Sequence, residues 1–195
     1  MIYHLLSFFL KLLSYTPFCV LYVLSDCLFY LLYYVVRYRR RIVRKNLTES
    51  FPEKSEQEII QIEKKFYQYF TDQVLESCKM ATISSEEMSK RMKFTNIEDA
   101  NAVLRSGKTI SLYMGHYGNW EWVSSIPLCL EPNVLAVQIY HKLRNENMDR
   151  LLLYQRERMG AISVEMRKTA RYITQLKTAN KVSIIGFIAD QSPRK

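Results

Sequence analysis

The sequence has few of the residues that interrupt or crosslink a chain. Its 195 residues include only 5 glycines, 5 prolines and 4 cysteines. This scarcity, together with a hydrophobic share of 48%, excludes collagen-like, low-complexity and disordered chains. Four cysteines are too few to build a disulfide scaffold at this length. We therefore expect one globular domain with a hydrophobic core and one appended element.

Several motifs of catalysis and metal binding are also absent. The sequence contains no C-x-x-C, H-E-x-x-H or G-x-S-x-G pattern, so it predicts neither a metal site nor a serine nucleophile. The segment GKT at 107–109 ends like a phosphate-binding loop, but Ala102 stands where such a loop needs its first glycine. We therefore expect no bound metal, no cofactor and no ATP site.

Negative charge is in short supply. The chain has 28 lysines and arginines against 19 acidic residues, a formal net charge of +9. The segment 37–45, RYRRRIVRK, holds six bases and no acid, which indicates an anionic partner. These bases follow an apolar segment and lie beside no nucleic-acid recognition motif. We therefore expect anionic membrane lipid as a partner, and no nucleic acid.

The apolar segment 18–36 predicts a membrane anchor. Apart from Ser25 and Asp26 its residues are all apolar or aromatic, and a helix of that length covers about 28 Å, close to the hydrocarbon thickness of a bilayer. The bases that follow are expected to stay cytoplasmic. No small-residue cleavage site precedes them, which argues against a cleaved signal peptide. A helix lying flat in the interface remains an alternative because Asp26 is costly in a span, and so does a buried helix of a soluble protein.

The rest of the chain changes from helical to mixed periodicity. Apolar residues recur at helical spacing from about Ser55 to Met80, with Ser55 and Glu58 at the spacing of a capping box. A short helix is expected near 97–105, ended by Gly107. Strands at 108–115, 134–140, 161–166 and 181–190 then alternate with helices at 118–130, 147–159 and 168–178. This alternation predicts an α/β layered fold with a largely parallel sheet.

We accordingly divide the chain into three segments: a membrane anchor with its basic cytoplasmic flank at 1–45, a helical segment at 46–106, and an α/β core at 107–195. Ligands of open α/β sheets bind at the carboxyl ends of strands. The chain ends five residues after the last expected strand, among such residues. We therefore expect the core to be incomplete at its C-terminus.

His116 is the candidate for proton transfer. It follows an expected strand in MGHYGNWEW, and Glu121 comes five positions later. A carboxylate can hold one imidazole nitrogen while the other takes a proton from a substrate hydroxyl. The alternative is a surface histidine beside a glutamate that starts a helix.

These residues carry a resemblance to a known family. The chain resembles the bacterial lipid A biosynthesis lauroyl/myristoyl acyltransferases, which are related to lysophospholipid acyltransferases. Four blocks carry the likeness in the same order: His-x4-Glu in GHYGNWEW, YHKLRNENMD at 140–149, the Arg-x-Arg of QRERMG, and Asp190 with Gln191. The likeness covers essentially the whole chain. Family members continue well past Asp190, which supports the expectation of a truncated C-terminus.

The resemblance implies a function and a site. It implies an N-terminal membrane helix, a glycerol-phosphate-acyltransferase-like α/β domain on the cytoplasmic side of the inner membrane, and transfer of a fatty acyl chain from acyl carrier protein to a hydroxyl of a lipid A precursor. His116 is the expected general base and Glu121 the residue that orients it. The expected substrate-binding residues are Asn119, Tyr140, Lys142, Arg156, Arg158 and Asp190. Two alternatives stay open: an acyltransferase of the same fold acting on a phospholipid or aminolipid, and a membrane-anchored binding module without activity.

Overall fold

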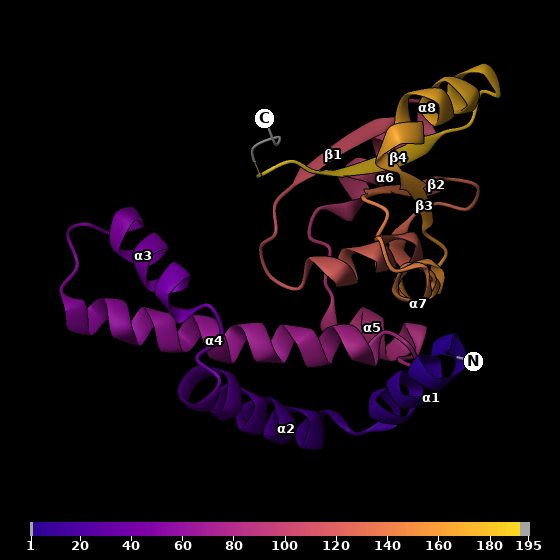
Figure 1. Cartoon of the computed structure of the whole chain (residues 1–195). Helices are drawn as coiled ribbons and strands as arrows, with labels where there is room; N and C mark the ends of the chain where they lie inside the picture. The colour runs from indigo at the N-terminus through magenta and orange to yellow at the C-terminus, as the bar shows by residue number, and fades with distance from the viewer. Residues whose placement is uncertain (1, 192–195) are drawn as a thin grey trace. The chain divides into compact units, whose positions relative to one another are not determined.

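The computed structural model describes residues 2–191, and these form two compact units (Figure 1). One unit joins the chain up to Ser14 with the chain from Met80 onward, and the other runs from Tyr15 to Lys79. The first contains the sheet and the second is helical. The division into anchor, helical segment and α/β core at residues 45 and 106 stays a prediction.

The helical unit contains the apolar segment and the long amphipathic helix. Its elements are α2 (Phe18–Tyr30), the π-helical turn η1 (Leu31–Val35), α3 (Arg40–Ser50) and α4 (Glu56–Lys79). The predicted long helix is confirmed as α4. Its capping box forms as expected, since the Ser55 N–H donates to the Glu58 carboxylate at 2.9 Å and the Glu58 N–H donates to the Ser55 hydroxyl oxygen at 3.4 Å.

One helix of the described residues is long and apolar enough to cross a membrane. It comprises Phe18–Val35, with a mean hydropathy of 1.8, and only 22% of that stretch is buried. The criterion rests on length and composition alone. The low burial favours membrane association over the core helix of a soluble protein, because a core helix would be mostly covered.

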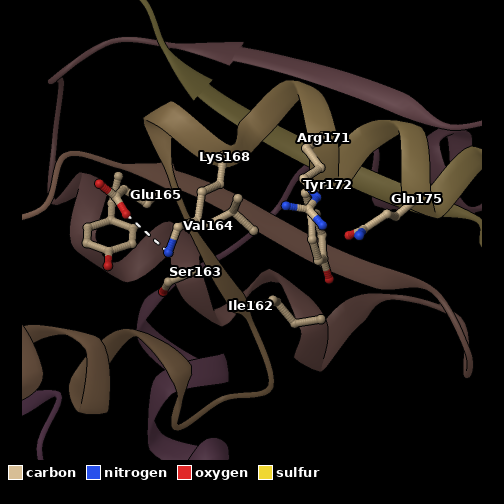
Figure 2. Close-up of a pocket in the computed structure, with 9 residues that line it drawn as sticks. Ile162, Ser163, Val164, Glu165, Lys168, Arg171, Tyr172 and Gln175 are labelled. Atoms are coloured by element: carbon tan, nitrogen blue, oxygen red, sulfur yellow. Dashed lines mark ion pairs between the residues drawn. The ribbon is translucent and has the colours of Figure 1, made fainter.

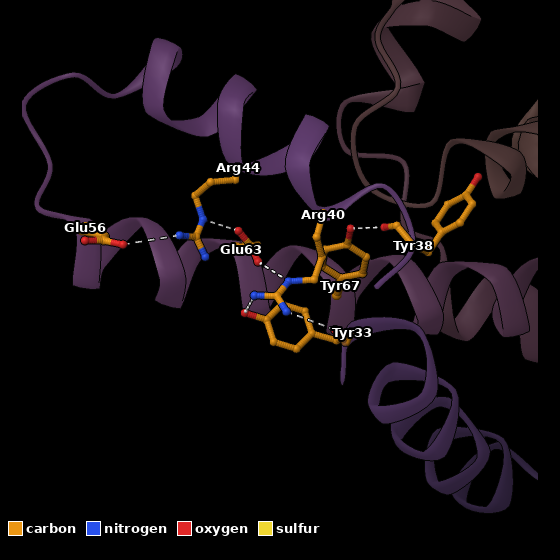
Figure 3. Close-up of polar contacts among 7 residues, drawn as sticks. All are labelled: Tyr33, Tyr38, Arg40, Arg44, Glu56, Glu63 and Tyr67. Carbon is orange, nitrogen blue, oxygen red and sulfur yellow. Dashed lines mark hydrogen bonds and ion pairs between the residues drawn. The ribbon is translucent and has the colours of Figure 1, made fainter. Parts of the chain in front are cut away.

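A buried ion cluster fixes α3 against α4 inside the helical unit. The Glu63 side chain is fully buried, and it accepts hydrogen bonds from the Nε atoms of Arg40, at 3.0 Å, and Arg44. Tyr33 and Tyr67 are buried beside it, with ring centroids 5.4 Å apart (Figure 3). The six bases of 37–45 are therefore not equivalent, although they form one cluster in the sequence.

The α/β unit holds a four-stranded parallel sheet and helices on both of its faces. Its elements in chain order are α1 (Ile2–Tyr15), α5 (Ser85–Arg91), α6 (Ile97–Arg105), β1 (Ile110–Met114), η2 (Trp120–Cys129), β2 (Leu135–Tyr140), α7 (Glu146–Glu157), β3 (Ile162–Glu165), η3 (Met166–Lys168), α8 (Thr169–Thr178) and β4 (Ser183–Ile188). The strand order is β1-β4-β2-β3, with every pair parallel. The predicted α/β fold with a parallel sheet is confirmed.

The two faces of the sheet follow from the alternation of side chains along its strands. On one face Val137 and Ile185 pack with Leu176 of α8. On the other, the neighbouring residues Ala136 and Ile184 pack with Ile126 of η2, together with side chains near and within α6. A period of two therefore buries both faces, which explains the nearly continuous apolar sequence of β4.

The helix expected at 118–130 forms at Trp120–Cys129 as the 3-10 helix η2, which contains Pro127. Proline supplies no N–H to a helix, and the hydroxyls of Ser124 and Ser125 donate to carbonyls three residues back, each at 2.7 Å. Helices α1, α3 and α5 are not among the helices that the sequence predicts.

Candidate active site

The parallel pairing of β1 with β4 sets the position of the site. Met114 ends β1 opposite Ile188 of β4, and the Ala189 N–H donates to the Met114 carbonyl at 3.0 Å. The residues that follow the two strands therefore leave the sheet side by side. His116 comes after β1 and Asp190 after β4, although 74 positions separate them in the sequence.

The Asp190 carboxylate holds His116 at two points. Oδ2 accepts the His116 backbone N–H at 2.8 Å, and Oδ1 lies 2.8 Å from Nδ1 of the ring. These two contacts with His116 lower the pKa of Asp190. Because an ionised carboxylate only accepts hydrogen bonds, Nδ1 carries the proton and Nε2 is left as an acceptor. Within residues 2–191 no hydrogen bond engages Nε2.

Packing keeps the ring in place and leaves it accessible. Trp120 meets the imidazole edge to face, with ring centroids 4.9 Å apart. Gly115 permits the close approach of the two strand ends, since a Cβ there would lie 3.2 Å from Asp190 Oδ2. The side chains of His116 and Asp190 are 34% and 41% exposed, so a substrate hydroxyl can reach Nε2.

The structure does not pair His116 with Glu121 as the sequence predicts. Both carboxylate oxygens of Glu121 instead accept from Arg156 of α7, at 2.7 Å from Nε and 2.6 Å from the terminal nitrogen. A two-point bond to a permanent cation is stronger than one bond to an imidazole, which explains the choice of partner. Burial opposes the charge of Arg156, but the hydrogen bonds and attraction of Glu121 raise its pKa on balance. The expected orienting contact is therefore made by Asp190.

Arg158 is engaged elsewhere. Its guanidinium donates to the carbonyl oxygens of Met80, at 2.5 Å, and Ile83, at 3.1 Å, two residues that are almost fully buried. These contacts satisfy carbonyls that the chain leaves unpaired after α4 ends. The geometry therefore gives Arg158 structural partners in the fold, while its role in substrate binding stays a prediction.

The remaining candidates lie at or after the carboxyl ends of strands β1 and β2. Tyr140 ends β2, and burial together with the charge of Asp149 raises its pKa. Lys142 is exposed in the following loop. Asn119 precedes η2 in the turn that contains Gly118, whose φ is +64°. The structure thus brings His116 and Asp190 together and Glu121 and Arg156 together.

A shallow cavity of about 430 Å³ lies at the opposite edge of the sheet, between β3 and α8 (Figure 2). Among its lining residues are Tyr140, Glu165, Lys168 and Tyr172, and Lys168 pairs with Glu165 at 3.4 Å. Because β4 and β2 separate β3 from β1, this cavity is not part of the His116 site.

The described residues contain no group of three or more histidine, cysteine, aspartate or glutamate side chains that could hold a metal ion. The arrangement at His116 instead suits general base catalysis, with an oriented imidazole and an available Nε2. The sequence places Asp190 at a strand end but does not reveal its role. That role depends on β4 lying directly beside β1, which is a property of the strand order.

Comparison with known proteins identifies the family of the chain. No individual curated protein matches the chain significantly. The profile of the family described as bacterial lipid A biosynthesis acyltransferase matches residues 1–193, which is nearly the whole sequence. The match confirms the resemblance found in the sequence blocks. The chain therefore belongs to the bacterial lipid A biosynthesis acyltransferase family, and its enzymatic class is acyltransferase.

Proposed function

We propose that this protein transfers a fatty acyl chain from the thioester of an acyl carrier protein to a hydroxyl group of a lipid A precursor. The reaction would take place at the inner membrane, with the α/β unit in the cytoplasm and the basic segment at anionic lipid. The observation that carries the proposal is the His116–Asp190 pair, which leaves Nε2 open to a hydroxyl. Family membership supplies the acyl-transfer chemistry.

The proposed step uses one base and no covalent enzyme intermediate. Nε2 of His116 takes the hydroxyl proton while the hydroxyl oxygen bonds to the thioester carbonyl carbon. The carbon–sulfur bond then breaks, and the leaving thiolate receives the proton from the imidazolium. Asp190 keeps the ring in the required tautomer and stabilises its positive charge. Direct transfer fits the site because no serine or cysteine of residues 2–191 hydrogen-bonds to His116.

The charge that develops on the carbonyl oxygen needs hydrogen-bond donors. The Arg156 charge is already balanced by Glu121, and Arg158 is bound to main-chain carbonyls. We therefore assign this task to backbone N–H groups of the turn at 118–119. The Glu121–Arg156 pair is assigned a positioning role, because it joins η2, which begins directly after that turn, to α7.

The test is product formation by the purified full chain in detergent, followed by mass spectrometry. A His116→Asn variant is expected to lower kcat by about a thousandfold, the typical size of a lost general base. The matched control is His141→Asn, because His141 is exposed and its Nδ1 lies 3.0 Å from the carbonyl oxygen of the neighbouring Lys142. Thermal midpoints of the three proteins should agree.

Separate arms test the substrates. The proposed donor is wrong if product forms with acyl coenzyme A and not with acyl carrier protein. The proposed acceptor is wrong if product forms only with a lysophospholipid. Retention of activity in the His116→Asn variant would refute the proposed role of the imidazole.

A further inference from the structure

The basic segment after the apolar helix is divided by one buried carboxylate. Arg40 and Arg44 both donate to Glu63, whose side chain is completely buried (Figure 3). The Arg40 guanidinium also lies 4.2 Å from the centroid of the Tyr33 ring. Removing either arginine would leave a buried charge with fewer partners, which is costly. These two bases are therefore committed to holding α3 on α4.

The other bases point away from this cluster. Arg40 and Arg44 stand four positions apart on the covered face of α3, whereas Arg41 and Lys45 lie on its exposed face. Arg37 and Arg39 precede the helix and are also exposed. Within the described part of the chain, Arg37, Arg39 and Arg41 make no ion pair, while Lys45 lies 3.7 Å from Glu49.

Apolar side chains surround the free bases. Val35 and Val36, which end the apolar segment, are 74% and 55% exposed, and Ile42 on α3 is 47% exposed. Exposed bases interleaved with exposed apolar side chains, directly after a helix that can cross a bilayer, match the boundary between hydrocarbon and headgroups. A nucleic acid or an acidic protein would give the valines no apolar environment.

We propose that Glu63 splits the basic segment into two arginines that fix the fold and three that bind the phosphates of an anionic bilayer. Arg40 and Arg44 form the first set, and Arg37, Arg39 and Arg41 form the second. The proposal rests on the membrane location in the proposed function and deepens it by assigning individual side chains. It does not depend on acyl transfer.

The experiment measures lipid selectivity with no acyl donor or acceptor present. The full chain is reconstituted in phosphatidylcholine bilayers that contain a trace of spin-labelled phosphatidylglycerol or spin-labelled phosphatidylcholine. Electron spin resonance then gives the fraction of each labelled lipid that is immobilised by the protein. The wild type is expected to prefer phosphatidylglycerol. The preference should fall at least fivefold in the triple variant Arg37→Gln/Arg39→Gln/Arg41→Gln. Fivefold is about the effect of a single base near an anionic surface, so it is the minimum expected for three.

Matched variants separate the two sets of arginines. Arg41→Gln should lower the preference and leave the thermal midpoint unchanged, whereas the adjacent Arg40→Gln should lower the midpoint and keep the preference within about twofold. The control Arg167→Gln/Lys177→Gln/Lys181→Gln removes the same charge from exposed positions of the α/β unit and should change neither quantity.

Two results would overturn the proposal. One is a triple variant at 37, 39 and 41 that keeps its preference for phosphatidylglycerol. The other is an equal loss of preference in Arg40→Gln and Arg41→Gln, which would mean that the basic segment acts as an undivided charge. Because no substrate is present, either result would leave the proposed acyl transfer untouched.

Discussion

Two carboxylates in this protein hold cationic or titratable partners at similar distances, and their surroundings give them different roles. Glu63 in the helical unit is fully buried and binds two guanidinium groups. Asp190 in the α/β unit is 41% exposed and binds the single imidazole of His116. A guanidinium stays charged at every physiological pH, whereas an imidazole gains and loses a proton. Burial and the choice of partner therefore separate a structural ion cluster from a site that can move protons.

The Glu121–Arg156 pair lies between these extremes. Its side chains are 18% and 21% exposed, and the two-point contact leaves neither carboxylate oxygen for His116. Like the Glu63 cluster, the pair joins two helices, here η2 and α7. Like the His116–Asp190 pair, it includes a residue that follows β1 within a few positions. The comparison shows why the first carboxylate after a histidine in the sequence need not be its partner in space.

The largest expected effect comes from breaking the buried cluster. Arg44→Met leaves Glu63 with Arg40 as its one guanidinium partner among the described residues, and we expect a loss of about 3 kcal/mol in the free energy of unfolding. Chemical denaturation of the helical signal in detergent measures it. Lys45→Met on the exposed face of the same helix is the control and should cost about 0.5 kcal/mol or less. Equal losses in the two variants would contradict the structural role of Arg44.

A smaller effect is expected at the exposed pair, and it concerns rate. Asp190→Asn keeps the shape of the side chain and removes the charge that favours imidazolium, so kcat should fall by about tenfold. The effect is smaller than that of a buried triad aspartate because solvent screens the pair.

The control for this variant is Asp99→Asn, an exposed aspartate in the first turn of α6. It should leave kcat unchanged. If Asp190→Asn keeps the wild-type kcat while Glu121→Gln lowers it, then Glu121 is the orienting residue in the active protein and the observed pairing is not the catalytic one.

The smallest expected effect is a difference between variants of Glu63 and Asp190 in how their stability depends on pH below pH 5. Burial raises the pKa of Glu63, but the hydrogen bonds of Arg44 and Arg40 outweigh it and lower the pKa on balance. A carboxylate with a lowered folded pKa stabilises the fold above its unfolded pKa of about 4.3, and that contribution is lost as pH falls through the folded value. The stability of a Glu63→Gln variant should therefore fall less steeply than that of the wild type below about pH 4.3.

Thermal unfolding of both proteins between pH 3 and 7 measures this difference. The gap between their midpoints should stay constant above pH 5 and narrow below pH 4. An Asp190→Asn variant should change the stability profile in the same direction but less, because the Asp190 carboxylate is 41% exposed and solvent screens its contacts with His116. A gap between wild type and Glu63→Gln that does not change with pH would mean that Glu63 is not ionised in the fold.

Local sequence signals were sufficient for most of the secondary structure. Helical spacing and a capping box predict α4, and Asn145 caps α7, accepting N–H bonds from Asn147 and Met148 at 3.0 and 3.1 Å. The four strands appear within the expected segments. These features depend on neighbours in the chain, so a single sequence reveals them.

The structure differs from the sequence-based expectations at two helices, η2 and α3. Residues 120–129 have the apolar pattern of an α-helix, but Pro127 and two serine hydroxyls favour 3-10 geometry. The sequence does not predict helix α3, because its bases have the pattern of a basic segment that follows a membrane anchor. Its stability depends on Glu63, which lies 19 positions after Arg44 and gives no local signal.

The sequence by itself determined the class of fold, the apolar helix, the basic segment and the family, because composition, periodicity and ordered motifs are properties of the chain. It also placed His116 and Asp190 at strand ends. Only the tertiary structure decided which charged groups meet. The strand order puts β4 beside β1 and so joins His116 to Asp190, while the packing of α3 on α4 buries Glu63 between two arginines. Electrostatic pairing depends on distance and burial in space, and neither can be obtained from separation along the sequence.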